Sequence, residues 1–74
     1  MPTQKLPRPG ARLSAREVEV LQLVAEGQTN ERIAAVLDLS PKTIKAHLAR
    51  IARKLGTGRR AGMVGTGFRR GYLR

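Results

Sequence analysis

Apolar positions recur at helical spacing in four segments of the chain. Between residues 14 and 26 they fall at i, i+1, i+4 and i+5. Between residues 41 and 55 they fall at i, i+4, i+7 and i+11, which is the clearest stripe in the sequence. Shorter runs with the same period predict helices over 30–37 and 59–70. The period-two alternation typical of strands does not occur, so the pattern predicts an all-α fold.

Polar residues before the apolar stripes indicate where these helices begin. Ser14 followed by Glu17 is a capping box. Ser40 before Pro41 is typical of a helix start, because the missing N–H of proline costs nothing in the first turn. The three glycines within 59–70 weaken that helix by up to about 1 kcal/mol each relative to alanine.

Size and composition restrict the class of protein. The 74 residues make one domain, with residues 1–12 predicted as a flexible basic arm and residues 13–74 as the folded part. The chain has no cysteine and therefore no disulfide or thiolate metal site, and we expect no cofactor. It contains no apolar run of membrane-spanning length and no secretory signal, so a cytoplasmic location is expected.

Positive charge is concentrated in the second half of the sequence. Of the 15 basic and five acidic residues, which give a net charge of +10, the first 38 positions hold five basic and all five acidic ones. Residues 39–74 carry the other ten basic residues and no acidic one. This asymmetry indicates a polyanionic partner, either nucleic acid or an anionic membrane surface. The membrane surface is disfavoured, because the basic residues and apolar stripes belong to several short helices rather than one long amphipathic helix.

The segments 30–37 and 41–55 are separated by three residues, which is the arrangement of a helix-turn-helix. The second helix of such a motif enters the major groove of DNA and reads base edges. Opposite its apolar stripe, 41–55 carries basic side chains and small alanines that allow a close approach. This outer side carries Lys42, Lys45, Ala46, Ala49, Arg50 and Arg53. At the start of this segment, the hydroxyls of Ser40 and Thr43 suit contacts with DNA phosphates.

The chain from Leu13 onward resembles the LuxR-type (GerE-like) helix-turn-helix domain over about four-fifths of its length. The motifs that carry the resemblance are Leu-Ser-x-Arg-Glu from position 13, Glu-Gly-x-Thr-Asn-x-x-Ile-Ala from 26, Leu-Ser-Pro-Lys-Thr-Ile-Lys-x-His from 39 and Lys-Leu-Gly from 54. The resemblance implies a four-helix, stand-alone regulator that binds specific double-stranded DNA and controls transcription, working at the nucleoid. It also implies a homodimer formed through the last helix. The implied dimer residues are Ala61, Val64, Gly65 and Phe68. Mapped onto matching positions, the resemblance implies base contacts by Lys45, Ala46 and Ala49, to which the basic outer side adds Arg50. It implies DNA backbone contacts by Thr29, Asn30, Lys42, Thr43 and His47, which Ser40 and Arg53 are expected to join.

Some positions depart from the family pattern. Many relatives have a basic or polar residue where this chain has Ala49, so one base contact is either missing or replaced by Arg50. Arg32 stands where the family often has glutamate, which removes the second capping box. Glycines at 62, 65 and 67 replace the usual glutamine or alanine, so the dimer is expected to be weak or to form only on DNA.

The sequence is less consistent with other functions. A module similar to region 4 of sigma factors would contact RNA polymerase as well as promoter DNA, but His47 and the Lys-Leu-Gly segment favour the LuxR-type interpretation. With either function, RNA polymerase or a partner regulator is a further candidate for a protein partner. We expect no enzymatic activity, because the sequence offers no paired nucleophile and base and no metal-ligating cluster. The N-terminal arm either follows a minor groove or is a free tail.

Overall fold

The computed structural model describes residues 8–74, which contain four helices and no strand. The helices are α1 (Ala15–Ala25), α2 (Asn30–Leu37), α3 (Pro41–Leu55) and α4 (Arg60–Arg69). The predicted all-α, four-helix fold is confirmed, and the bounds of α2 and α3 agree with those predicted. The first and last helices are one residue shorter at each end than predicted, because those end residues are caps with non-helical backbone.

The helix starts are fixed by the side chains that the sequence indicated. The Ser14 hydroxyl accepts the Glu17 N–H at 3.1 Å, and the Glu17 carboxylate accepts the Ser14 N–H at 2.8 Å, which completes the capping box. Thr29 and Ser40 cap α2 and α3 in the same way, through single bonds of 3.2 and 3.1 Å. Each cap satisfies a backbone N–H that the helix itself leaves without a partner.

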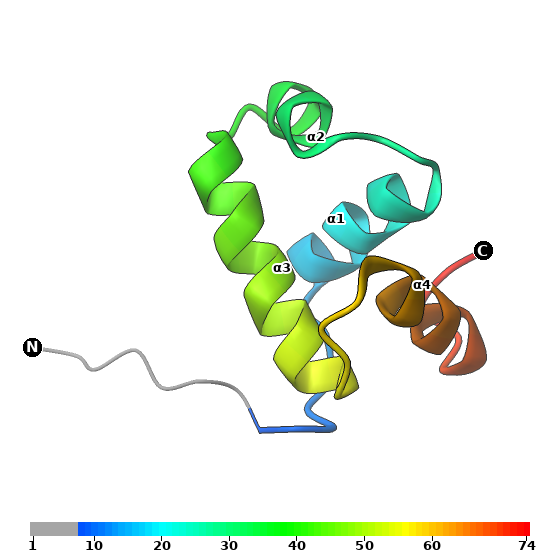
Figure 1. The fold of residues 1–74 in the computed structure, drawn as a ribbon. Coiled ribbons are helices and arrows are strands. Elements are labelled where there is room, and N and C mark those ends of the chain that lie inside the picture. Colours follow the sequence, from blue (N-terminus) through cyan, green and yellow to red (C-terminus); the bar gives the residue numbers. More distant parts are fainter. Residues whose placement is uncertain (1–7) are drawn as a thin grey trace, which may run out of the picture.

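The core lies where α1, α2 and α4 meet the inner side of α3 (Figure 1). Its members are the aliphatic side chains that define the predicted stripes, joined by residues near both ends of the domain. They are Leu13, Val20, Leu21, Val24, Ile33, Ala34, Ile44, Leu48, Ile51, Leu55, Met63 and Leu73. Burying each large aliphatic side chain contributes roughly 1.5–3 kcal/mol, so this cluster holds α3 against the other helices.

The packing of α4 differs from the sequence expectation. Of the apolar stripe of Ala61, Val64 and Phe68 that predicted this helix, only Val64 packs partly against the core, whereas Ala61 is exposed and Phe68 is 48% exposed. The buried face is instead Met63, Thr66 and Gly67. A Cβ at Gly67 would lie 2.9 Å from side-chain atoms of both Leu21 and Leu73, so glycine is what lets α4 approach α1 this closely. The glycines that weaken the helix on propensity grounds therefore include one that packing requires.

Residues 8–11 form a turn attached to the end of α3, which we call the N-terminal turn. The Ala11 N–H donates to the Arg8 carbonyl at 3.0 Å, and Gly10 has φ +84°. Proline followed by a glycine of positive φ is the pattern of a type II turn. The Gly10 N–H then donates to the Lys54 carbonyl at 2.7 Å. Residues 1–7 of the predicted arm lie outside the described residues.

Candidate nucleic-acid interface

The helix-turn-helix is formed by α2, a turn over 38–40 and α3 (Figure 1). Asp38 ends α2 in the left-handed conformation, with φ 57° and ψ 45°. Aspartate is one of the few non-glycine residues that tolerate this region. The Leu39 N–H donates a hydrogen bond to the Ala34 carbonyl at 2.8 Å, which closes the turn. This local geometry sets the direction in which α3 leaves α2.

Helix α3 has one face in the core and an opposite face in solvent. Its inner face is the stripe from Ile44 to Leu55, and its outer face presents cationic and methyl groups. The exposed outer residues are Lys42, Lys45, Ala46, Ala49 and Arg53. Lys45, the residue on which the predicted base contacts most depend, is thus exposed. A basic helix face with small side chains between the charges has the shape and the charge to enter a major groove.

The predicted backbone-contacting residues lie mainly at the starts of α2 and α3. In the first turn of α3, Ser40 and Thr43 form a hydroxyl pair at 2.9 Å, and the Thr43 N–H donates to the Ser40 hydroxyl at 3.1 Å. At the start of α2, the Asn30 side-chain oxygen accepts from the Arg60 guanidinium at 3.0 Å, which also donates to the Gln28 carbonyl at 2.8 Å. Helix N-termini of this kind attract phosphates through their N–H groups and dipole.

Arg60, at the first position of α4, was not among the predicted site residues. Its side chain is exposed and places a positive charge beside the start of α2. His47 and Arg50, by contrast, are half-buried on the flanks of α3. The structure therefore separates the predicted set into exposed outer residues and residues that pack partly against the rest of the domain.

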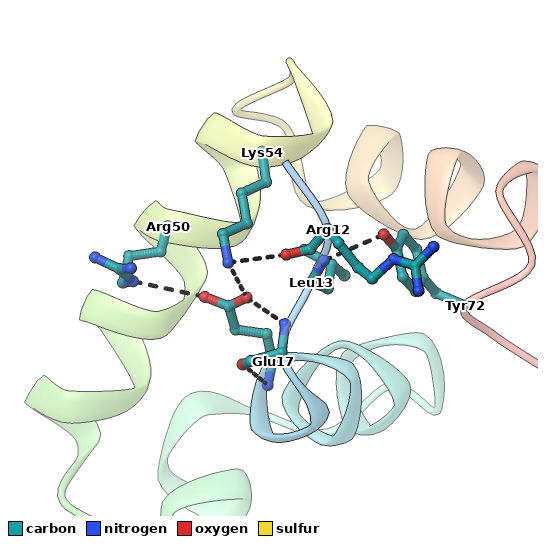
Figure 2. A network of polar contacts seen from close by, with 7 residues as sticks. Arg12, Leu13, Glu17, Arg50, Lys54 and Tyr72 are labelled. Atoms are coloured by element: carbon teal, nitrogen blue, oxygen red, sulfur yellow. Dashed lines mark hydrogen bonds and ion pairs between the residues drawn. The ribbon is translucent and has the colours of Figure 1, made fainter. Parts of the chain in front are cut away.

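Arg50 belongs to a charge network that sequence reasoning missed, shown in Figure 2. Its Nε lies 3.5 Å from one carboxylate oxygen of Glu17, and the other oxygen accepts from Lys54 Nζ at 2.6 Å. Lys54 Nζ also donates to the Arg12 carbonyl at 3.1 Å. Glu17 and Lys54 are both buried, whereas the Arg50 side chain stays 43% exposed. The network connects α1 to the C-terminal half of α3 and orients that helix.

The Glu17 carboxylate stays ionised within this network. Its burial acts to raise the pKa, but hydrogen bonds from Lys54 and Ser14, with the positive charge of Lys54, outweigh burial and hold the pKa of Glu17 below its ordinary value. A buried carboxylate paired with a buried ammonium is stable only when both are well hydrogen-bonded, as they are here. The Glu17–Lys54 pair therefore holds α3, the candidate DNA-reading helix, against α1.

The predicted dimer residues share one side of α4. Ala61 and Phe68 are exposed, and Val64 and Gly65 are half-buried. This side lies opposite the face formed by Met63 and Gly67 that packs on the core. The structure thus brings the four residues together on one side of α4, from which Val64 also packs partly against the core.

Within residues 8–74, no three His, Asp or Glu side chains gather in a group able to hold a metal ion. No helix in this described part is long and apolar enough to cross a membrane.

Comparison with known proteins identifies the family. The family described as "Bacterial regulatory proteins, luxR family" matches residues 11–65, which include all of α1, α2 and α3. This match defines a bacterial regulator with a helix-turn-helix domain. The chain belongs to the LuxR family.

Individual relatives agree with this assignment. The chain is 46% identical over 61 residues to the "Probable transcriptional regulatory protein NarL" of Mycobacterium tuberculosis. These 61 residues make up 82% of this chain and 28% of that protein. It is 42% identical over 59 residues to the "Uncharacterized response regulatory protein YgeK" of Escherichia coli, covering 80% and 40%. It is 38% identical over 63 residues to the "HTH-type quorum sensing-dependent transcriptional regulator RpaR" of Rhodopseudomonas palustris, covering 85% and 26%. The chain thus spans well under half the length of these relatives. Because all three are named as regulators, the module similar to sigma region 4 is not favoured.

Proposed function

We propose that this chain binds a specific double-stranded DNA site through α3 and regulates transcription there. The observation that carries the proposal is the exposed outer face of α3, where Lys42, Lys45 and Arg53 surround Ala46 and Ala49. The membership of the LuxR family and the names of the relatives supply the biological context. Such a protein acts at the nucleoid, in the cytoplasm of a bacterium, and uses neither a cofactor nor enzymatic chemistry.

The residues of the outer face take different roles in this proposal. Lys45 and the two alanines face base edges, where a lysine donates to guanine acceptors and a methyl packs on thymine. Lys42 and Arg53, with the capping hydroxyls of Ser40 and Thr43, contact phosphates and fix the position of α3. Arg50 is held partly by Glu17, so its contribution to base reading is smaller than that of Lys45.

We further propose that two copies associate through α4 when they occupy adjacent half-sites. On the face of Ala61, Val64, Gly65 and Phe68, the exposed side chains of Ala61 and Phe68 supply apolar surface for a second copy. Small residues at two of these positions, Ala61 and Gly65, allow two helices to approach closely, but they bury little area, and the net charge of +10 on each copy opposes association in free solution. DNA would neutralise that charge and support the dimer. Contact with RNA polymerase or with a partner regulator would follow binding.

The test compares two lysines on α3. Duplexes that the protein selects from random DNA serve as the binding site for wild type, Lys45→Ala and Lys42→Ala. If Lys45 reads a base, its loss costs about 1–3 kcal/mol on the selected site and relaxes the base preference at one position. Lys42→Ala, the matched control, weakens binding to selected and unrelated duplexes equally, since it removes a phosphate contact. Unchanged affinity and unchanged base preference in Lys45→Ala would overturn the assignment of α3.

A further inference from the structure

The N-terminal turn is fastened to the candidate DNA-reading helix by its backbone. The Lys54 carbonyl belongs to the last turn of α3, where carbonyls have no partner within the helix. The Gly10 N–H satisfies this carbonyl at 2.7 Å. This bond requires a φ of +84° at residue 10, which glycine adopts freely because it has no side chain, whereas any other residue would be strained there. The turn therefore has a defined place beside α3.

The turn directs the chain toward the outer face of α3. Pro9 borders the same shallow hollow as Ala49, Ala52 and Arg53, on the flank of α3 that includes a predicted base-contacting position. Figure 1 shows the described N-terminal segment passing beneath the C-terminal end of α3 and leaving on the side away from α1 and α4. Arg8, the residue before this proline, is exposed. A positive charge is thus carried to the side of α3 that the proposed function assigns to DNA.

The length of α3 determines which part of the DNA lies near Arg8. The helix has 15 residues. At a rise of about 1.5 Å per residue it is about 22 Å long, whereas the major groove is about 12 Å wide. With the N-terminal half of α3 at the base edges, its C-terminal half reaches the wall of the groove. That wall is built of sugar and phosphate.

We propose that Arg8, held by the N-terminal turn, contacts a DNA phosphate at the edge of the major groove next to the C-terminal half of α3. This inference rests on the proposed function and adds a phosphate-binding position to it. The guanidinium of arginine binds phosphate oxygens in a bidentate manner. The contact strengthens binding without reading sequence, and it makes the segment before α1 part of the interface.

The experiment measures the salt dependence of binding to the selected duplex for wild type, Arg8→Ala and Arg74→Ala. Arg74 is the matched control, because it is also exposed but lies by α1 and Tyr72, away from α3. Losing one phosphate contact reduces the slope of log K against log salt by about 0.9, which corresponds to roughly five-fold weaker binding at 0.15 M salt. We expect this change in Arg8→Ala, with unaltered base preference, and no change in Arg74→Ala.

A second variant tests whether the turn positions the arginine. Gly10→Ala strains the backbone that donates to Lys54, so it should reduce the salt slope as Arg8→Ala does, and the double variant should lose no more than either single one. A slope for Arg8→Ala equal to that of Arg74→Ala would overturn the inference, and so would an altered base preference. If wild type discriminates its selected duplex but Arg8→Ala changes nothing, only this inference fails. If wild type does not discriminate at all, the proposed function fails with it.

Discussion

The buried pair of Glu17 and Lys54 is the strongest test of how α3 is held in place. Replacing Glu17 by glutamine keeps the volume of the side chain and its capping bond, since glutamine also serves at this position of a capping box. The substitution removes the negative charge that faces Lys54 Nζ at 2.6 Å and Arg50 Nε at 3.5 Å. The Glu17 side chain is only 4% exposed and that of Lys54 10%, so water cannot replace the lost charge without opening the structure.

The size of the effect follows from this geometry. Removing one partner of a buried ion pair costs about 3–5 kcal/mol when the other charge is left uncompensated. Here the Arg12 carbonyl, 3.1 Å from Lys54 Nζ, and the new amide oxygen remain as acceptors, which places the expected loss at about 2–3 kcal/mol. Arg50 is 43% exposed and adds at most about 1 kcal/mol. Small domains have roughly 5–15 kcal/mol of stability, so Glu17→Gln remains folded but is measurably weaker.

Urea unfolding followed by helical circular dichroism at pH 7 measures the loss. Lys54→Met and the double variant complete the cycle, because replacing both charges by groups of similar size removes the penalty of an unpaired buried charge. We expect the double variant to be at least about 1 kcal/mol more stable than the sum of the single losses predicts. A Glu17→Gln protein within about 0.5 kcal/mol of wild type, together with additive losses, would show that the pair does not hold α3.

Two further predictions concern acid and helix packing. Because the pKa of Glu17 is lowered in the folded state, its stabilising contribution is present above the unfolded value of about 4.3 and disappears as the pH falls below it. Urea titrations between pH 3 and 7 should show the stability gap between wild type and Glu17→Gln closing at the acid end, and a constant gap would contradict this. Gly67→Ala should lower stability by about 1–2 kcal/mol through its contacts with Leu21 and Leu73. Gly65→Ala meets only the flexible end of Arg69 and should raise stability by up to about 1 kcal/mol, so thermal melts that shift in the same direction would refute the packing argument.

Local signals in the sequence were sufficient to predict the helices. Ser14 and Ser40 each form the expected cap, and the stripe from Ile44 to Leu55 gives α3 its buried side and hence its outer face. These features depend on residues no more than a few turns apart, which is why periodicity and capping rules detect them. The exposure of the outer lysines followed from the same periodicity.

The features that could not be predicted depend on contacts between distant segments. The Glu17–Lys54 pair joins residues 37 positions apart, and nothing in the local pattern around Lys54 separates it from the exposed cations. Gly67 lowers helix propensity, and only the approach of α4 to α1 makes it a packing residue. The sequence Arg-Pro-Gly-Ala at 8–11 is typical of a turn, but sequence alone predicts it as part of a flexible arm. Its hydrogen bond to the Lys54 carbonyl forms only once α3 has folded into place, so no local pattern indicates it.

The central claim is that the outer face of α3 reads a particular DNA sequence. The most direct measurement is the ratio of dissociation constants for the selected duplex and a shuffled duplex of equal length at 0.15 M salt. We expect wild type to prefer the selected duplex by about a thousand-fold or more, in the range of specific regulators, and Lys45→Ala to reduce this ratio by about five-fold or more. Equal binding of the two duplexes by wild type would contradict this claim.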